Sequence, residues 1–334
     1  FYNNVAEYNG GAVYLIGNAT ENCTNITFID CNFTLNLAKL NGGAVYWAKG
    51  SSNATGNGTY FDNNTAKRSA GAIYISGDYL YIKDTQFRFN NATMEQTYDN
   101  RTGAGFFSSE GGNAGAICWM GSYGTVDNGT FINNTAFRRG GAIQFERNQE
   151  GTVKNSLFEN NTAGSDGGAI DWYQGAVNGQ LVNSTFRTNY VSDSDARGSA
   201  VYIEGYNATI KDSRFYEHNS ITDGGAVYIE GDEASVENTT FENINTAKKG
   251  GAIFVTGDNA TITESNFTNV RADVDGGAIY INGQNTTILG SKFDGTSSIK
   301  KGGAIYVEGR NASIIESRFI NSTSSDSDGG ALYV

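Results

Sequence analysis

Apolar residues recur along this chain in short alternating runs, separated by glycine, asparagine and serine. Directly after each alanine of a recurring Gly-Gly-Ala segment stands an aliphatic residue, and two positions further on stands another apolar residue. All three tryptophans, Trp47, Trp119 and Trp172, fall at that second position. Such period-2 alternation predicts a β-strand whose aliphatic and tryptophan side chains point inward.

A second apolar run follows about ten residues later, as in Ile262, Ser265 and Phe267. The spacing from Ile262 to Ser265 is odd, so the inward parity changes there and the chain must bend. A third short arc, which ends at the next Gly-Gly pair, closes the unit. A glycine pair permits a sharp corner, because a side chain would clash there or φ must be positive.

The alanines of these segments set the period of the repeat. They are Ala12, Ala44, Ala72, Ala116, Ala142, Ala169, Ala200, Ala226, Ala252, Ala278, Ala304 and Ala331. The ground spacing is 26 residues, and such a period is typical of a solenoid. Three short strands per period predict an all-β, single-stranded parallel β-helix that forms one continuous domain over residues 1–334. About twelve coils would give a rod roughly 55–60 Å long, at the strand spacing of about 4.8 Å.

One long insertion interrupts the repeat. The arc after Phe87 is 18 residues longer than the others, which predicts an inserted loop over residues 93–112, and a smaller insertion follows Phe186. Loops of this length on a regular fold are often functional.

Seven coils carry the motif Phe-x-x-Asn, which is lost from Phe215 onward. Equivalent asparagines on stacked coils can hydrogen-bond to one another and form an asparagine ladder. The pairs are Phe1–Asn4, Phe33–Asn36, Phe61–Asn64, Phe87–Asn90, Phe131–Asn134, Phe158–Asn161 and Phe186–Asn189.

Gly-Gly-Ala-(Ile/Val/Leu) combined with Phe-x-x-Asn resembles the repeats of chlamydial polymorphic outer-membrane proteins. It is also similar to the repeats of adhesin-like surface proteins of methanogenic archaea, and the loss of Phe-x-x-Asn after residue 190 favours this looser archaeal type. The resemblance covers essentially the whole chain. It implies a right-handed parallel β-helix on a cell surface and a role in adhesion or surface coating, and it brings no catalytic residues with it.

The residue before each Gly-Gly pair alternates in charge over eight coils. Unlike charges on neighbouring coils attract one another, and the alternation disfavours a slip by one coil. This charge ladder consists of Arg139, Asp166, Arg197, Asp223, Lys249, Asp275, Lys301 and Asp328. It matches a 52-residue superperiod, so the duplicated unit is a pair of coils.

An aromatic stripe runs two residues after the alanines, and Cys118, Gln144 and Asp171 interrupt it. Exposed aromatics in a row form either a binding surface for sugar or protein or a ladder that stabilises the strand face. Because the neighbouring alanine shares this outward parity, we expect a neighbouring chain or the 93–112 loop to cover the face. The stripe consists of Tyr14, Tyr46, Tyr74, Tyr202, Tyr228, Phe254, Tyr280, Tyr306 and Tyr333.

The chain holds 20 Asn-x-Ser/Thr sequons, of which 19 end in Thr, whereas composition alone predicts about seven. Repeat copying explains some of them. Those within insertions favour selection for N-glycosylation and hence secretion. The acceptors are Asn18, Asn22, Asn25, Asn32, Asn53, Asn57, Asn63, Asn91, Asn100, Asn128, Asn133, Asn160, Asn183, Asn207, Asn238, Asn259, Asn266, Asn285, Asn311 and Asn321. Asn259, Asn285 and Asn311 lie on successive coils, so we expect short glycans or incomplete occupancy there.

The net charge of −12 argues against nucleic-acid binding. Three cysteines are too few for a disulfide framework, but Cys23 and Cys31 are a candidate pair in an oxidising space, with Cys118 left over. Neither a metal-binding spacing nor a cofactor motif stands out.

An enzyme reading needs a cluster outside the repeat. The only histidine, His218, takes the place of a ladder asparagine and is expected to cap a turn. The best acidic cluster is Asp193, Asp195 and Asp212, near the smaller insertion. We therefore expect no enzyme but an extracellular, N-glycosylated, adhesin-like rod or filament of the cell surface. Its expected partners are further coils or copies of itself at both ends and a surface carbohydrate or protein receptor. The alternative is a β-helix that binds or cleaves polysaccharide.

Overall fold

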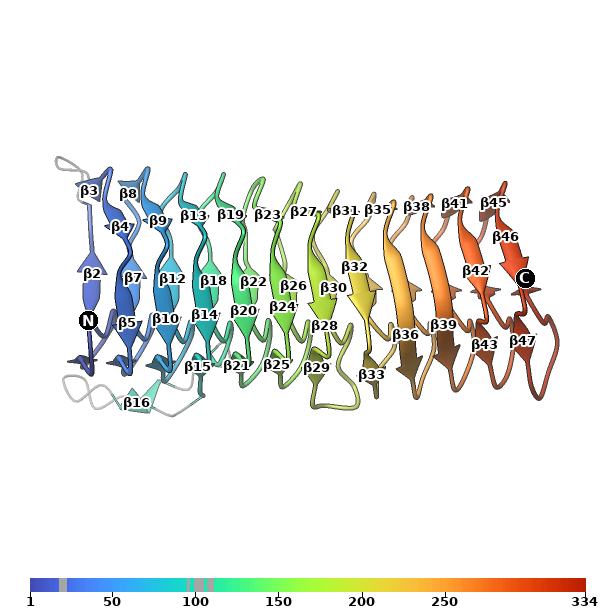
Figure 1. Cartoon of the computed structure of the whole chain (residues 1–334), viewed down its shortest axis with the longest axis horizontal. Helices are drawn as coiled ribbons and strands as arrows, with labels where there is room; N and C mark the ends of the chain where they lie inside the picture. The colour runs from blue at the N-terminus through green and yellow to red at the C-terminus, as the bar shows by residue number, and fades with distance from the viewer. Residues whose placement is uncertain (18–22, 95–96, 99–104, 107–110) are drawn as a thin grey trace.

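The computed structural model describes residues 1–17, 23–94, 97–98, 105–106 and 111–334. Their backbone winds into a rod of stacked coils, with the two termini at opposite ends (Figure 1). Within these ranges every regular element is a β-strand, and the long sheets are built from parallel pairs in register. The prediction of a right-handed parallel β-helix is confirmed. No helix of the described part is long and apolar enough to cross a membrane.

The strands that directly follow the Gly-Gly-Ala segments form the first sheet. Its twelve strands, one from each coil, run the length of the rod. They are β2 (Val13–Leu15), β7 (Val45–Trp47), β12 (Ile73–Ile75), β18 (Ile117–Trp119), β22 (Ile143–Phe145), β26 (Ile170–Trp172), β30 (Val201–Ile203), β34 (Val227–Ile229), β37 (Ile253–Val255), β40 (Ile279–Ile281), β44 (Ile305–Val307) and β48 (Leu332–Tyr333).

The second sheet has eleven strands and carries the inward Ile or Val of the second apolar run. They are β4 (Thr27–Ile29), β9 (Thr55–Asn57), β13 (Tyr81–Lys83), β19 (Thr125–Asp127), β23 (Thr152–Lys154), β27 (Gln180–Val182), β31 (Thr209–Lys211), β35 (Ser235–Glu237), β38 (Thr261–Thr263), β41 (Thr287–Leu289) and β45 (Ser313–Ile315).

The third sheet carries the phenylalanines. Its main strands are β5 (Asn32–Thr34), β10 (Tyr60–Asp62), β14 (Gln86–Arg88), β20 (Thr130–Ile132), β24 (Leu157–Glu159), β28 (Thr185–Arg187), β32 (Arg214–Tyr216), β36 (Thr240–Thr246), β39 (Asn266–Ala272), β42 (Lys292–Asp294) and β46 (Arg318–Ile320), and β33 (Asn219–Ser220), β43 (Ser297–Ser298) and β47 (Thr323–Ser324) join its C-terminal part.

A fourth, narrow sheet closes the first coils with two-residue strands. They are β1 (Val5–Ala6), β6 (Leu37–Ala38), β11 (Thr65–Ala66), β15 (Asn91–Ala92), β21 (Thr135–Ala136), β25 (Thr162–Ala163) and β29 (Tyr190–Val191). Two small pairs complete the fold: β3 (Cys23–Thr24) lies parallel to β8 (Ser51–Ser52), and β16 (Thr97–Tyr98) lies antiparallel to β17 (Gly105–Phe106) within the predicted 93–112 loop. The rest of that loop falls largely outside the described residues.

A left-handed corner separates the second and third sheets where the sequence predicts a bend. Glu264, between β38 and β39, has φ +49°, and other coils place Asp84 or Asn238 there with positive φ. The glycine pair makes the corner before the first sheet. Gly250 has φ +65°, and a Cβ on Gly251 would lie 1.9 Å from the Gly277 carbonyl oxygen, so no side chain fits.

The alanine of Gly-Gly-Ala faces inward, contrary to the expectation that it shares the outward parity of the tyrosines. Ala44 and its described equivalents from Ala72 to Ala304 are fully buried within the main core cluster. The backbone N–H groups of both Ala12 and Val13 donate to one acceptor, the Ala44 carbonyl oxygen, at 2.9 and 3.0 Å. The same shared acceptor recurs in each coil up to Ala304, and the side-chain parity shifts between the alanine and the strand.

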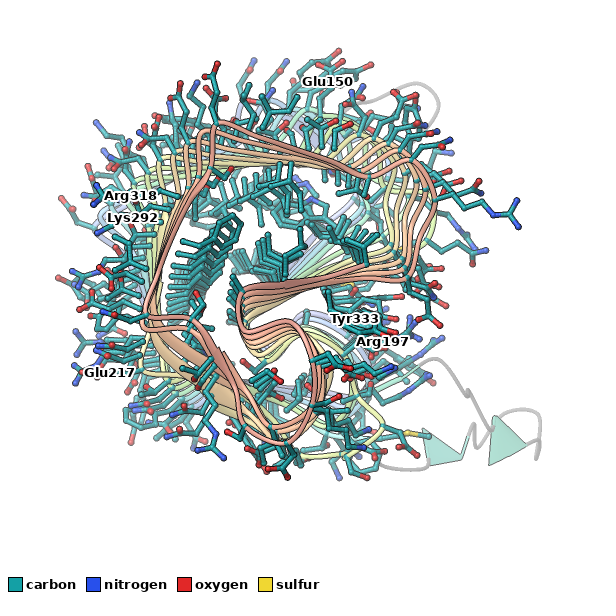
Figure 2. All side chains as sticks on the ribbon, turned by 90° about the vertical axis from the view of Figure 1, so that its right-hand side faces the viewer. Glu150, Arg197, Glu217, Lys292, Arg318 and Tyr333 are labelled. Carbon is teal, nitrogen blue, oxygen red and sulfur yellow. The ribbon has the colours of Figure 1, made fainter. Side chains whose placement is uncertain are left out.

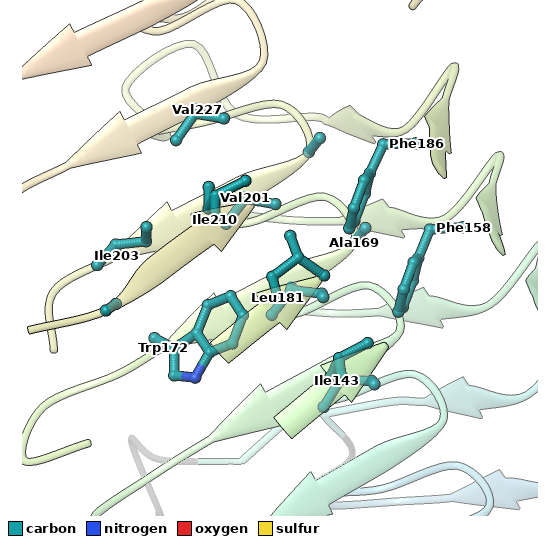
Figure 3. Close-up of a cluster of buried hydrophobic side chains, with 14 of the residues drawn as sticks. Ile143, Phe158, Ala169, Trp172, Leu181, Phe186, Val201, Ile203, Ile210 and Val227 are labelled. Atoms are coloured by element: carbon teal, nitrogen blue, oxygen red, sulfur yellow. The ribbon is translucent and has the colours of Figure 1, made fainter. Parts of the chain in front are cut away.

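A stack of twelve phenylalanines fills one side of the core. From Phe1 to Phe319 the ring of every coil lies parallel to the next, with centroids 4.4 to 5.1 Å apart. Figure 3 shows the parallel rings of Phe158 and Phe186 opposite Leu181 and Trp172. Offset stacking at this spacing is favourable, so identical residues at one site give each coil a preferred neighbour.

Two of the tryptophans of the first sheet, Trp119 and Trp172, are matched by glycine. A Cβ on Gly124 would lie 1.9 Å from the Trp119 ring, and one on Gly179 would lie 2.2 Å from Trp172 Nε1. Coils with Ile at the tryptophan position, such as Ile203, carry Ala208 where Gly179 stands. In these coils a larger residue at one core position is therefore accompanied by a smaller residue at the other.

The asparagines of Phe-x-x-Asn form the predicted ladder inside the rod. Asn64 Nδ2 donates to Asn90 Oδ1 at 3.0 Å and to the Phe33 carbonyl oxygen at 2.9 Å. Asn64 Oδ1 accepts from the backbone N–H and the Nδ2 of Asn36, at 3.0 and 2.9 Å. All four hydrogen-bonding positions of this buried amide are thus used. The same side-chain bonds link the rungs from Asn4 to Asn189.

His218 ends this ladder. Its side chain is fully buried, with Nε2 3.4 Å from the Phe186 carbonyl oxygen and Nδ1 3.2 Å from the Asn189 carbonyl oxygen. A neutral imidazole can donate to only one of these two acceptors. Burial lowers the pKa of His218 to about 4, although both carbonyl contacts favour the charged form. His218 therefore caps the ladder as a neutral group.

Candidate functional site

The aromatic stripe lies on the outer face of the first sheet, and its rings stack on one another. Centroids are 5.2 Å apart for Tyr14–Tyr46, 4.7 Å for Phe254–Tyr280 and 4.8 Å for Tyr280–Tyr306. Because each ring covers the face of the next, mainly ring edges and hydroxyl groups are left for contact with a ligand.

The stripe is not freely solvated along the rod. Tyr14 is 49% exposed, but Tyr202 is fully buried, Tyr280 is 2% exposed and Phe254 is 7% exposed. Arg197, Lys249 and Lys301, which each precede a Gly-Gly pair or its equivalent, lie over stripe rings. Figure 2 shows Arg197 and Tyr333 on the same side of the cross-section, where the ribbon folds inward. Among the described residues, cover for Tyr202, Tyr280 and Tyr333 thus comes from the chain's own charge ladder.

The charge ladder makes ion pairs at its N-terminal end. Arg139 Nε lies 3.4 Å from Asp166 Oδ2, and Arg197 Nη2 lies 3.1 Å from the same oxygen. Asp166 is nearly buried between them. These three residues realise the predicted attraction between neighbouring coils.

Further along, the lysines contact tyrosines instead of the acidic side chains. Lys249 Nζ lies 4.4 Å from the centroid of the Tyr280 ring and 3.0 Å from its hydroxyl oxygen, and Lys301 makes the same contacts with Tyr333. A cation over an aromatic ring is attracted by the ring's quadrupole. The carboxylates of Asp223 and Asp275 accept the backbone N–H groups of Lys249 and Lys301, at 3.0 and 3.1 Å.

Glutamates that the sequence analysis did not single out complete this surface. Tyr202 donates its hydroxyl hydrogen to Glu230 Oε2 at 2.5 Å, and Tyr280 donates to Glu308. Burial, and then these hydrogen bonds, raise the pKa of both tyrosines, so both stay protonated donors. Glu230 and Glu308 stand four residues after the alanine of their Gly-Gly-Ala segment, and Glu204 stands at the equivalent position. This recurrence in the sequence could have identified the glutamates as part of the surface.

The three residues that interrupt the stripe are buried together. Gln144 Nε2 donates to Asp171 Oδ2 at 3.1 Å, and Cys118 Sγ lies 3.9 Å from Gln144 Oε1. Burial raises the pKa of Asp171 well above its usual range, and nearby Arg139 opposes this only in part. Burial also raises the pKa of the Cys118 thiol, which makes it unreactive.

An open cleft of about 810 Å³ lies beside this point. It is lined by Arg138, Arg139, Asp166 and the smaller insertion at 192–194. The predicted acidic cluster is divided: Asp195 lies 3.6 Å from Lys248 Nζ, whereas Asp212 lies at a corner between β31 and β32 and accepts from Asn238. In the part of the chain that the structure describes, no three His, Cys, Asp or Glu side chains could hold a metal ion.

The predicted disulfide between Cys23 and Cys31 is wrong, because both side chains are free thiols. Strand β4 lies between them. An extended strand of three residues spans about 10 Å, beyond the roughly 7 Å over which two Cα atoms can be bridged. Cys31 packs against the core and contacts the Ile29 carbonyl oxygen at 3.3 Å.

Seventeen sequon asparagines fall within the described residues, and none of them is buried. Asn18, Asn22 and Asn100 lie outside that range. The contrast with the inner ladder is sharp at Asn63-Asn64, where the sequon residue is exposed and its neighbour is fully buried.

Thirteen of the seventeen have positive φ, for example Asn63 at +53° and Asn259 at +57°. Asparagine tolerates this conformation better than most residues. The threonine two positions later then begins or continues a strand, as Thr261 begins β38. Backbone geometry is therefore a second reason, besides selection for glycosylation, why these tripeptides recur.

Two family models match parts of this fold. The model of the right handed beta helix region matches residues 199–333. The Chlamydia polymorphic membrane protein repeat matches residues 58–76 and 155–171, which contain the ladder residues Asn64 and Asn161. These repeats are similar to the chlamydial ones, as the motifs predict. No curated protein sequence matches the chain.

Solved structures share the β-helix at low sequence identity. A PL6 alginate lyase in complex with a trisaccharide has a TM-score of 0.51 and 11% identity, covering 96% of this chain and 86% of that chain. An alginate lyase from Paenibacillus sp. str. FPU-7 has a TM-score of 0.43 and 13% identity, covering 91% and 99%. PfbA, a surface adhesin of Streptococcus pneumoniae, has a TM-score of 0.40 and 12% identity, covering 91% and 85%. At these identities the likeness concerns the fold alone.

Proposed function

We propose that this chain is an extracellular, N-glycosylated, adhesin-like rod of a cell surface, which acts in adhesion or as an envelope scaffold. One observation carries the proposal: none of the described sequon asparagines is buried, while the asparagines of Phe-x-x-Asn from Asn36 to Asn189 are buried as ladder rungs. Acceptors for an oligosaccharide must be exposed, and the described sequon asparagines meet this requirement.

The core supports a stiff rod. Stacked phenylalanines run through all twelve coils, and the asparagine ladder adds hydrogen bonds between the first seven. Such a solenoid holds surface groups at fixed intervals of about 4.8 Å. The similarity of residues 58–76 and 155–171 to chlamydial membrane-protein repeats supports a place on the cell surface.

Glycopeptide mass spectrometry on protein from its native source tests this proposal. We expect sugars on most of the sequons, and shorter glycans or partial occupancy at Asn285, which is hydrogen-bonded to both Asn259 and Asn311 on the adjacent coils. Peptides that contain Asn36 serve as an internal control, because this asparagine is buried and in no sequon. Bare asparagines throughout would overturn the glycoprotein proposal.

The second candidate is a β-helix that binds or cleaves polysaccharide. Its supporting observation is the cleft beside Arg139 and Asp166, at the one place where the stripe is interrupted. A panel of acidic polysaccharides, incubated with the chain and with Arg139→Ala, tests it by the appearance of new chain ends. We expect none; release of oligosaccharides that Arg139→Ala abolishes would replace our proposal with this alternative.

A further inference from the structure

Three described aromatic residues have left-handed backbone conformations, which bulky side chains rarely adopt. Tyr79, Phe89 and Tyr123 have φ values of +59°, +52° and +57°. Their exposed fractions are 54%, 49% and 41%. The corners of the coils require this conformation, and neighbouring coils place asparagine there. An exposed aromatic ring at such a corner is therefore unusual in residue type.

Phe89 stands directly between two sequons at one corner of the rod. The backbone N–H of Asn63 donates to the Arg88 carbonyl oxygen at 3.0 Å, and that of Phe89 donates to the Ile132 carbonyl oxygen at 3.1 Å. These bonds place Asn63, Phe89 and Asn133 in register on three successive coils. Asn63 and Asn133 share the left-handed backbone, with φ of +53° and +55°, so all three side chains leave the corner at equivalent positions.

A second corner repeats the arrangement. The Asn53 backbone N–H donates to the Asp78 carbonyl oxygen at 3.3 Å, which sets Asn53 one coil before Tyr79. Tyr123 stacks on the far side of Tyr79, with ring centroids 5.0 Å apart. The uncovered face of Tyr79 thus looks toward Asn53. A third case lies within a strand, where exposed Tyr60 is the register partner of the sequon residue Asn32.

We propose that Phe89 and Tyr79 are platforms for N-linked glycans, with the first sugars on Asn63 and Asn133 lying over the two faces of the Phe89 ring and the sugar on Asn53 lying over Tyr79. This inference rests on the proposed glycosylation. Coils are spaced by about 4.8 Å, which falls within the 4.5–7 Å over which rings stack. The ligand is the C–H face of a pyranose, which is apolar enough to cover a phenyl ring.

The attachment chemistry is compatible with this geometry. A glycosylated Nδ2 keeps one hydrogen, and the first sugar begins beyond the amide, over the outer part of the neighbouring ring. Asn63 and Asn133 are separated by a full coil, so two sugars can flank one ring without touching. The C-terminal half differs, because Asn285 is hydrogen-bonded to Asn259 on one adjacent coil and to Asn311 on the other, with no aromatic ring between them. The platforms thus mark the sites where a well-ordered glycan fits.

The test compares variants of the whole chain secreted from one host that attaches N-glycans. Phe89→Ser removes the platform, and Thr65→Ala with Thr135→Ala removes both sugars while leaving Asn64 and Asn134 in the ladder. Phe137→Ser is the matched control, because Phe137 is 58% exposed with Thr93 and Gly164, not sequon asparagines, on the adjacent coils. Glycopeptide mass spectrometry measures occupancy, and thermal unfolding measures the contribution of the sugars.

We expect the sugars on Asn63 and Asn133 to raise Tm by about 2–4 °C in the wild-type chain and by less than half of that in Phe89→Ser. Phe137→Ser should leave the sugar-dependent shift unchanged. Sugar protons of the two sites should also show upfield ring-current shifts by NMR that disappear in Phe89→Ser. If both sites are occupied but the shift in Tm and the sugar resonances do not depend on Phe89, the platform is overturned and the glycoprotein proposal stands. If neither Asn63 nor Asn133 carries a sugar in this host or in the native protein, both the platform proposal and the proposed glycosylation of these two sites are overturned.

Discussion

At the scale of single residues, the single histidine gives the inner ladder a defect that depends on pH. His218 occupies a ladder position but cannot donate to both carbonyl groups as a neutral ring. Its pKa falls to about 4 in the fold, because burial disfavours the charged form. In the unfolded chain a histidine titrates near 6.5. At pH values between these two pKa values, His218 is therefore mostly protonated in the unfolded state and mostly neutral in the folded state.

We predict that the free energy of unfolding falls as pH drops from about 6.5 to about 4, with no contribution from His218 above 6.5. At pH 5 the loss should be about 2 kcal/mol. His218→Asn should remove this loss, because an amide at that position can continue the ladder from Asn189. Denaturant unfolding of both proteins at pH 7 and pH 5 checks this. Equal losses in the two proteins would show that other groups carry the acid sensitivity.

The matched core pairs give a second prediction at this scale. Gly179→Ala should destabilise the chain by about 1–3 kcal/mol, because the new methyl group meets the Trp172 ring at 2.2 Å. Adding Trp172→Ile recreates the combination of Ile203 and Ala208 in the next coil. The double variant should be more stable than the sum of the two single changes predicts, by 1 kcal/mol or more. The free energy of unfolding is measured for the wild-type chain, the two single variants and the double variant. If the effects of the two substitutions simply add, residues 172 and 179 are not matched in size.

At the scale of elements, the ladders determine how the coils associate. The phenylalanine stack is apolar and repeats identically, so it fixes spacing without distinguishing one coil from another. The asparagine ladder is directional, since each side-chain amide donates to the asparagine of the next coil and accepts from the asparagine of the preceding coil. It therefore links the N-terminal seven coils by a continuous series of amide hydrogen bonds. Ile244 and Val270 interrupt side-chain hydrogen bonding at this position, and Thr296 and Ser322 resume it as a single pair.

Asn134→Ala should cost about 3–5 kcal/mol, because it leaves buried partners on Asn90, Phe87 and Asn161 without hydrogen bonds. Asn133→Gly is the adjacent control. It removes a side chain that faces solvent and keeps a residue that tolerates positive φ, so it should change stability by no more than about 0.5 kcal/mol. Chemical denaturation at pH 7 measures both. A similar effect of the two substitutions would mean that the ladder contributes little.

The sequence predicted the elements well because their cause is local and repeated. The same types of residue recur at the inward-facing positions of each coil. The fold and the asparagine ladder could therefore be predicted from Phe33, Asn36 and their equivalents in other coils. The face of Ala44 was predicted wrongly, because the parity changes where two consecutive N–H groups share one carbonyl acceptor, and the residue types at this position do not indicate that sharing. The partners of Lys249 were equally hidden: its chain reaches the Tyr280 ring on the next coil instead of the Asp223 carboxylate.

The candidate surfaces were predictable in position but not in exposure. The tyrosine stripe stands where the period places it, yet Arg197 and Glu230 cover Tyr202 because of their rotamers. The pairing of Cys23 with Cys31 failed for a different reason. Sequence separation does not reveal that the segment between two residues is an extended strand.

At the scale of the whole molecule, the rod has an alternation that the core does not require. Core residues repeat every coil, whereas the charge ladder repeats every two. Coils could therefore slip or be deleted singly without loss of apolar packing, but not without placing like charges side by side. The ion pairs of Asp166 with Arg139 and Arg197, and the backbone N–H groups held by Asp223 and Asp275, are the contacts that such a change would break.

Deletion of residues 250–275 should expose this two-coil register. The deletion joins Lys249 to Gly276, keeps one complete Gly-Gly-Ala corner and brings Lys249 next to Lys301. Adding Lys301→Asp with Asp328→Lys to the deleted chain restores strict alternation and should stabilise it by about 1 kcal/mol. The same two substitutions in the full-length chain place Asp275 beside a second acid and should destabilise it by a similar amount.

The opposite signs separate charge register from every effect of the substitutions alone, including loss of the contact between Lys301 and the Tyr333 ring. Both differences should shrink in 1 M salt, where the Debye length falls to about 3 Å. Thermal and denaturant unfolding of the four proteins at low and high salt provide the measurement. If the substitutions act with the same sign in both backgrounds, the alternating ladder does not set the register, and the duplication of coil pairs has left a pattern without a structural role.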